Sequence, residues 1–359
     1  MGNQPVMSGS HEICFGFCLP IFAAPGAGLF RTPGYQRLDA ATTLQLGVTA
    51  DRLGYDSLWV ADHLFMGADD AILEGWTTLC TLAGATQRAK LGMIHMAHFL
   101  RHPSMTAKMT ATLDQLSSGR LIHFVDGGNR ADEFGAYGLP WAELMPDRVA
   151  HLVEEIEMTL AMWTQAGPVD YAGQHYHLHQ ALCEPKPIQS PHPPIWLGEV
   201  DPHMLDACAR YGQGWNSTPV TIDGMRQRLE LLGDACNRAG RDPGEITKSL
   251  EMQILIADDL AGVRDRLQQI SQLDPTTPPA PELAAFIAGD TDVVPESVAR
   301  TTLIGSPDDV AGQLQAYIDL GISHFMMWFL DAPDETGLRL FADIVAPRFR
   351  PGNTMAGSA

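Results

Sequence analysis

An aspartate and a histidine, Asp62-His63, directly follow the short apolar segment 57–60. We expect that segment to be a strand, and in a parallel barrel the carboxyl ends of the strands carry the reactive groups. Imidazole transfers protons near neutral pH, so His63 is the first acid–base candidate, with Asp62 as the second catalytic candidate. The alternative is a histidine that only hydrogen-bonds neighbouring loops.

His95 and His98 lie three residues apart in the expected strand 91–99. Strand alternation then places their side chains on opposite faces. His98 is nearer the end of the strand and is the pocket candidate, whereas His95 is expected to be structural.

A glycine-rich turn, Asp126-Gly127-Gly128-Asn129-Arg130, follows the expected strand 121–125. Paired glycines let the backbone approach a flat or phosphorylated ligand, and Asn129 and Arg130 supply hydrogen-bond donors. A glycine turn before a helix is also a common structural feature, so this motif alone is not specific.

A second turn, Gly198-Glu199-Val200-Asp201-Pro202, joins the expected strand 194–197 to a helix. Free backbone N–H groups at a helix start can bind phosphate. Glu199 and Asp201 oppose a dianion unless they point away, and the alternative is that these acids only complement the helix dipole.

Three alternating histidines, at 175, 177 and 179, share one face if they lie on a strand. Such spacing could hold a metal, but no carboxylate or cysteine completes a ligand set nearby. We expect a surface hairpin and no metal site.

Strand and helix patterns alternate along almost the whole chain and must position these side chains. Eight strands with intervening helices predict an α/β fold, a closed (β/α)8 TIM barrel, in preference to an open doubly wound sheet. The strands are expected at 13–19, 57–60, 91–99, 121–125, 194–197, 214–216, 249–257 and 324–329. The helices are expected at 39–53, 75–86, 103–116, 147–163, 202–211, 222–239, 307–320 and 335–345.

One domain is expected over residues 1–350, with insertions near 167–193 and 271–300 and a flexible tail at 351–359. The first insertion reads as a β-hairpin. The second is dense in proline, threonine and aspartate, which predicts a mobile lid or surface loop.

Composition excludes several classes of partner. The formal net charge of −20 argues against nucleic acid and anionic membrane surfaces, which require clustered Lys and Arg. The six cysteines form no Cys-x-x-Cys pair, which favours reduced thiols in a cytoplasmic protein. No apolar run is long enough for a membrane span, and no signal peptide is evident.

Together these landmarks resemble the bacterial luciferase-like flavin monooxygenase superfamily, which includes luciferase, alkanesulfonate monooxygenases and deazaflavin-dependent dehydrogenases. The resemblance spans roughly residues 12–350 and rests on the number and order of motifs. The matching stretches are Gly54–His63, His102-Pro103 with Ala107–Asp114, Ser118–Leu121, Glu133-Phe134 with Tyr137-Gly138, Glu184–Pro187, Pro193–Gly198 and Gly305–Val310.

The resemblance implies roles for individual residues. His63 takes the place of the active-site histidine, and Ala97 and His98 flank the isoalloxazine ring of the cofactor. The turn residues Asp126, Gly127 and Asn129 contact the flavin. Gly198, Glu199 and Val200 lie at the phosphate end of the cofactor. Arg148 could support the phosphate or the substrate. Many relatives carry glycine or serine where this chain has Glu199.

The implied function is that of a flavin-dependent monooxygenase. Reduced FMN from a separate NAD(P)H:flavin reductase reacts with O2 to form a C4a-hydroperoxyflavin, which oxygenates a small organic substrate. This species needs exclusion of water and a placed proton donor. The chain has no G-x-G-x-x-G segment for its own nicotinamide domain, which agrees with an external electron source. A homodimer is expected from the resemblance alone.

Two alternatives stay open. One is a deazaflavin-dependent oxidoreductase that transfers hydride on the same barrel; the low number of Lys and Arg argues against it, because the acidic tail of that cofactor favours a basic groove. The other is a non-catalytic flavin-binding barrel. The substrate itself is not readable, but Phe65, Phe99 and Trp328 suggest a pocket for an apolar or ring-containing molecule.

Overall fold

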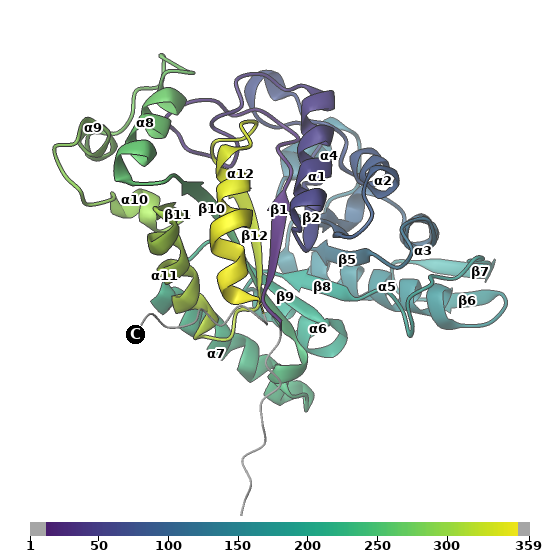
Figure 1. The fold of residues 1–359 in the computed structure, drawn as a ribbon. Coiled ribbons are helices and arrows are strands. Elements are labelled where there is room, and N and C mark those ends of the chain that lie inside the picture. Colours follow the sequence, from purple (N-terminus) through teal and green to yellow (C-terminus); the bar gives the residue numbers. More distant parts are fainter. Residues whose placement is uncertain (1–11, 351–359) are drawn as a thin grey trace, which may run out of the picture.

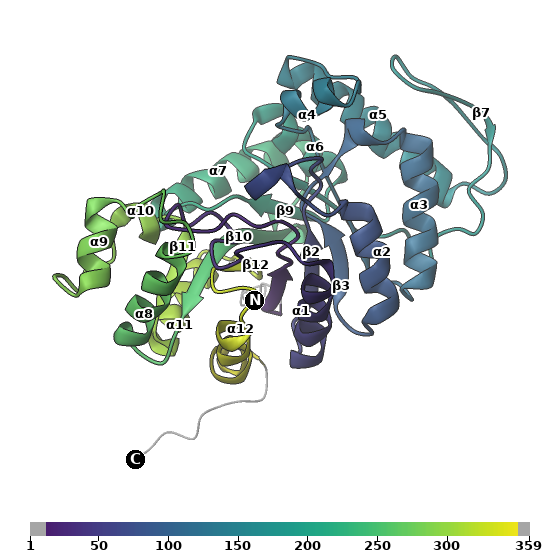
Figure 2. The same cartoon turned by 90° about the horizontal axis from the view of Figure 1, so that it is seen from above.

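The computed structural model describes residues 12–350, so the expected tail at 351–359 lies outside the described residues. Eight parallel strands close into a barrel, because each pairs with the next and the last pairs with the first (Figures 1 and 2). In barrel order they are β1 (Cys14–Cys18), β2 (Ser57–Val60), β3 (Lys90–Met93), β5 (Leu121–Asp126), β8 (Ile195–Gly198), β9 (Gly214–Ser217), β10 (Thr247–Ile256) and β12 (His324–Phe329). The predicted TIM barrel is confirmed.

Helices lie between the strands and surround the barrel (Figure 2). They are α1 (Ala40–Leu53), α2 (Gly75–Ala85), α3 (Pro103–Leu116), α4 (Ala131–Ala136), α5 (Met145–Thr164), α6 (Pro202–Tyr211), α7 (Ile222–Ala239), α11 (Pro307–Ile318) and α12 (Thr336–Leu340). Helix α11 begins with a capping box at Ser306 and Asp309, as its sequence suggests.

Large rings fill the lower barrel because facing strands carry glycine. A Cβ atom on Gly92 would lie 2.2 Å from the ring of Trp59, and one on Gly214 would lie 2.4 Å from the ring of Trp196. Both tryptophans are buried, so the barrel is a packed core and not a pore. Ligands that reach the strand ends must therefore enter from the rim.

The expected hairpin at 167–193 is present as β6 (Val169–Ala172) and β7 (His177–Ala181), which pair antiparallel and project beside α3 and α5 (Figure 2). Glu154 of α5 accepts three backbone N–H groups at the hairpin tip, from Gln174 to Tyr176. Within residues 12–350 no group of three or more His, Cys, Asp or Glu has the geometry of a metal site.

The segment 271–300, expected as an insertion, contains regular secondary structure. The segment holds two helices, α9 (Pro281–Ala288) and α10 (Glu296–Ala299), and it is flanked by α8 (Leu260–Ser271) and by β11 (Thr302–Gly305), which pairs with β10. Phe286 of α9 is buried against Leu267 of α8 in a small core of its own. These helices are too short to show a clear helical period, and the proline and glycine residues at their ends are also typical of loops.

A fully buried carboxyl group on α5 makes stability depend on pH. Both carboxylate oxygens of Glu155 lack hydrogen-bond partners among the described residues. Burial raises the pKa of Glu155 well above its ordinary value, and nearby Arg101 only partly opposes this. The folded state thus favours the protonated form, and stability is lost as the pH rises from the ordinary value toward the raised one.

We therefore expect Glu155→Gln to stabilise the protein by about 1–3 kcal/mol near pH 8, where the wild-type carboxyl carries this penalty. Near pH 4.5, the ordinary value for glutamate, the gain should shrink. Thermal unfolding at both pH values measures it, with exposed Glu230→Gln on α7 as the control. An equal gain at both pH values would contradict the prediction.

Candidate functional site

A cavity lies at the carboxyl ends of β2, β3 and β5, where the predicted site residues meet. It contains about 410 Å³ of space free of protein atoms, part of it open to solvent. Of the predicted residues, Asp62, His63, Ala97, Asp126 and Asn129 line it. Gly128 and Arg130 of the same predicted turn also line it, together with residues that the sequence reasoning did not choose for the site: Arg31, Ile94, His95, Glu133 and Phe134.

His63 is held by a buried carboxylate. Its Nδ1 lies 3.1 Å from Oε1 of Glu133, and Glu133 also accepts the backbone N–H of Leu64 at 3.1 Å. The His63 side chain is 16% exposed, and its Nε2 makes no hydrogen bond to any described residue. The pair therefore fixes the imidazole and leaves one nitrogen free to give or take a proton at the cavity.

Glu133 is a positioning residue that sequence reasoning missed. It lies on α4, 70 positions after His63, and nothing local connects the two. Arg130 approaches Glu133 with Nη1 at 3.2 Å, which further neutralises the carboxylate. The only available signal was the motif Glu133-Phe134, which the resemblance used without giving it a role.

His95 also faces the cavity, contrary to the expectation that it is structural. Strand β3 ends at Met93, the Ile94–His95 peptide bond is cis, and a two-residue strand, β4 (Met96–Ala97), follows. The alternation argument fails because no continuous strand runs from 91 to 99. His98 begins a 3-10 turn, His98–Leu100, and its side chain lies outside what the structure describes.

His95 forms an ion pair with Asp126, with Nδ1 2.7 Å from Oδ2, and its Nε2 is buried without a partner among the described residues. Asp126 also accepts the backbone N–H of Gly128 at 2.8 Å. Burial alone would lower the pKa of His95, but the charge and hydrogen bond of Asp126 outweigh it and raise that pKa.

Asp126→Asn should therefore lower the pKa of His95, because only the weaker effects of Glu251 and Glu199 then oppose burial. NMR titration of the His95 ring in the folded protein measures the change. Replacement of Asp201 by Asn, which removes a similar contact from exposed His203, is the control and should leave His95 unaffected. An unshifted His95 titration in Asp126→Asn would contradict this account.

Asp62 holds the strand ends together. Its carboxylate binds Arg101 through two hydrogen bonds of 2.8 and 3.1 Å and accepts the N–H of Ala97. Burial raises the pKa of Asp62, and Arg101 opposes that rise. Since its oxygens are occupied, Asp62 fits a positioning role better than the catalytic role predicted for it.

The turn predicted to hold phosphate does not line this cavity. Glu199 follows β8 with a φ of 75°, and its carbonyl accepts the indole N–H of Trp215. Burial raises the pKa of Glu199, although His95 opposes the rise. A carboxyl that protonates more readily can donate a hydrogen bond to phosphate, which reduces the conflict with an anion.

Two arginines stand near the turns that follow β5, β8 and β9. Arg148 of α5 is buried beside Gly127, and its Nη1 donates to the carbonyls of Ala142 and Glu143. Arg228 of α7 donates to Ser217 and Thr218 and faces Glu199. Gly198 is buried, whereas Val200 is half-buried against the main core.

The predicted substrate residues are not gathered in the cavity. Phe99 is buried in a separate cluster with Phe134 and Trp141, and Trp328 is buried inside the barrel. The ring of Phe65 lies 5.3 Å from the guanidinium of Arg130. None of the three lines the cavity itself, but each contacts a residue that does. Phe65 lies against Arg130, Trp328 against Arg31, and Phe99 against Phe134.

The cavity residues fit a flat ring with polar edges. Ile94, Ala97 and Phe134 supply apolar wall, and the unpartnered Nε2 of His95 supplies a buried polar atom for a ring substituent. The remaining lining residues are mostly polar or charged and can contact the polar edges of a bound ring. A flavin or deazaflavin ring is compatible with this lining.

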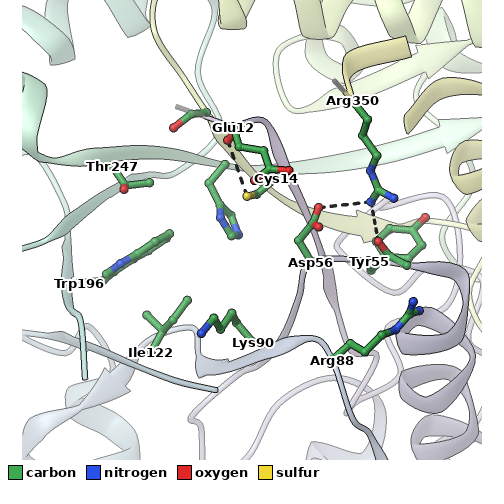
Figure 3. A pocket seen from close by; sticks show the side chains of 13 residues that line it. Glu12, Cys14, Tyr55, Asp56, Arg88, Lys90, Ile122, Trp196, Thr247 and Arg350 are labelled. Atoms are coloured by element: carbon green, nitrogen blue, oxygen red, sulfur yellow. Dashed lines mark hydrogen bonds and ion pairs between the residues drawn. The ribbon is translucent and has the colours of Figure 1, made fainter. Parts of the chain in front are cut away.

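A larger hollow lies at the opposite, amino-terminal end of the barrel (Figure 3). It contains about 1260 Å³ of space, part of it open to solvent. Arg350 pairs with Asp56 across one side of this hollow, and Trp196 closes another. None of the predicted site residues lines it, so it is not the candidate active site.

No helix within residues 12–350 has the length and apolar character that a bilayer crossing requires.

The family model for luciferase-like monooxygenases matches residues 15–324. The phthiodiolone/phenolphthiodiolone dimycocerosates ketoreductase of Mycobacterium tuberculosis (strain ATCC 25618 / H37Rv) is 26% identical over 327 residues, covering 77% of this chain and 84% of that protein.

The F420-dependent glucose-6-phosphate dehydrogenase of Kineococcus radiotolerans is 27% identical over 317 residues, covering 85% of this chain and 91% of that protein. The structure of monooxygenase RslO1 from Streptomyces bottropensis superposes with a TM-score of 0.73 at 24% identity, covering 94% of this chain and 100% of that one, and supports the fold. The match over most of the chain shows that this protein belongs to the luciferase-like monooxygenase family of oxidoreductases.

Proposed function

We propose that this chain is a deazaflavin-dependent oxidoreductase that transfers hydride between cofactor F420 and an alcohol or carbonyl substrate. The observation that carries the proposal is the His63–Glu133 pair, which leaves Nε2 of His63 free at the cavity. Interconversion of an alcohol and a ketone needs one group that takes or gives the hydroxyl proton. The similarity to a ketoreductase and to an F420-dependent dehydrogenase supports the same chemistry.

The chemistry supplied by the bound cofactor is two-electron hydride transfer at one carbon of the substrate. His63 Nε2 takes the hydroxyl proton as hydride leaves the adjacent carbon, and returns a proton in the reverse direction. Glu133 holds the ring in place and stabilises the charged imidazolium. Ile94, Ala97 and Phe134 keep water from the apolar side of the site.

The net charge of −20 does not decide against an anionic cofactor, because local charge at the rim matters more than the chain total. Arg148 and Arg228 lie beside the two turns that the resemblance assigns to cofactor contact. They offer positive charge for a phosphate and for the acidic tail beyond it.

A second candidate is the monooxygenase function with reduced FMN, O2 and a separate flavin reductase. Glu199 favours it, because luciferase-type members also carry an acid beside the phosphate seat. The same proton-handling histidine would serve either reaction. The homodimer implied by the resemblance is part of both proposals.

Parallel anaerobic titrations with F420 and FMN, each in oxidised and reduced form, distinguish the two. We expect F420 to bind at least about tenfold more tightly than FMN. F420 reduction by a secondary alcohol without O2 supports hydride transfer. Tight binding of reduced FMN alone, with a transient flavin–oxygen species after an O2 pulse, would overturn the deazaflavin proposal in favour of the second candidate.

A further inference from the structure

Arg31 enters the cavity from the loop between β1 and α1. Its backbone N–H donates to Oε1 of Gln253 on β10, and the N–H of Gly34 donates to the carbonyl of Leu330 just after β12. Arg31 has a φ of 49°, a conformation that this long-range anchoring maintains. The loop is thus fastened to the carboxyl ends of two strands and presents Arg31 to the cavity.

One side of the Arg31 guanidinium is fixed. Its Nη2 lies 3.0 Å from Oε1 of Glu251, which is 1% exposed and also accepts the indole N–H of Trp328 at 2.7 Å. The guanidinium carbon lies 5.0 Å from the centre of the Trp328 ring and 5.3 Å from that of Phe30. Stacking and the ion pair therefore hold the group in one place.

The other side of the guanidinium has hydrogen-bonding capacity to spare. Nε and Nη1 of Arg31 donate to no described residue, and the side chain is 22% exposed. Arg130, which lines the same cavity, differs because Asp132 and Glu133 take its Nε, Nη2 and Nη1 groups. Among the arginines that line this cavity, Arg31 is the one with two guanidinium nitrogens that have no partner within residues 12–350.

We propose that Arg31 binds a carboxylate of the substrate, so that the enzyme acts on hydroxy or oxo acids. This inference rests on the proposed function for the reacting end of the substrate. Nε–H and Nη1–H lie on different edges of the guanidinium, so either of them, together with the second N–H of Nη2, can match the two oxygens of a carboxylate. The ring of Phe30 is 48% exposed next to Arg31 and offers an apolar contact for the carbon skeleton.

Glu251 sets the strength of this subsite. Its charge compensates Arg31 and so weakens the attraction for a second carboxylate. Glu251→Gln can still accept the Trp328 N–H while it removes the competing charge. We expect this variant to bind a carboxylate more tightly than the wild type, an effect that a purely structural salt bridge would not produce.

Calorimetric titration with benzoate and benzamide tests the proposal, since the two probes share a shape and differ in charge. The wild type should prefer benzoate by about tenfold or more. Arg31→Gln should abolish that preference, and Glu251→Gln should increase it. Arg130→Gln is the matched control and should keep the preference. Circular dichroism confirms that each variant is folded. No preference in the wild type, or equal loss in both arginine variants, would overturn the proposal.

Repeating the titration with saturating F420 separates two sources of the anion. If Arg31 serves the substrate, benzoate still binds and Arg31→Gln changes F420 affinity by less than about twofold. If Arg31 instead holds the cofactor phosphate, F420 excludes benzoate and the variant binds F420 poorly, which overturns the proposal. Failure of F420 itself to bind overturns the proposed function, whereas the benzoate preference of the free protein still tests Arg31.

Discussion

Replacement of His63 by alanine should lower kcat by about 10²–10⁴-fold, the usual contribution of a placed acid–base group. The reason is that Glu133 fixes Nδ1 of His63, whereas Nε2 of His63 has no partner among the described residues and, unlike the Nε2 of His95, is not buried. The cofactor affinity should stay near that of the wild type, because the ring contributes no apolar wall to the site. Steady-state kinetics and a cofactor titration on the same preparation measure both quantities.

Two companion variants sharpen this test. Glu133→Gln keeps an acceptor for Nδ1 of His63 but loses the charge, so its kcat should fall less than that of His63→Ala. His203→Ala removes an exposed histidine that only pairs with Asp201, and it should leave kcat unchanged. An undiminished kcat in His63→Ala would remove this histidine from the mechanism.

The barrel could be predicted from sequence because each strand and helix carries its own local signal. Apolar runs such as 57–60 and 324–329 need no knowledge of the rest of the chain, and the structure has both strands at those bounds. Asp62 lies just after β2 and Asp126 is the last residue of β5, so their place at the rim follows from the fold. Strand periodicity therefore predicts which residues reach the cavity more reliably than what they do there.

Contacts between distant residues could not be predicted in this way. The partner of His63 lies on α4, and the partner of Arg31 lies 220 positions away on β10, so neither pair leaves a local pattern. His95 shows a second limit, because a break in β3 at Met93 reverses the face that alternation assigns to it. The role of a rim residue thus depends on tertiary pairing that one sequence does not display.

The motif Ser118-Gly119-Arg120-Leu121, which the resemblance used only as a landmark, has a structural explanation. Arg120 is buried, and its guanidinium donates to the carbonyls of Ala83 and Thr86 at the end of α2 and to that of Ala89 before β3. It also donates to the carbonyl of Ser117, at the end of α3. One side chain therefore satisfies the carboxyl ends of two helices and joins them to the barrel.

Arg120→Met keeps the aliphatic volume but leaves these carbonyls without donors. We expect a loss of about 3–5 kcal/mol, because several buried acceptors lose their partner together. For a chain of this length that corresponds to a fall in Tm of about 4–7 °C. Differential scanning fluorimetry measures it. Arg226→Met, which removes an exposed arginine paired with Asp223, should cost less than about 0.5 kcal/mol. If both variants melt together with the wild type, then Arg120 does not join the helices to the barrel, and water replaces its hydrogen bonds without loss.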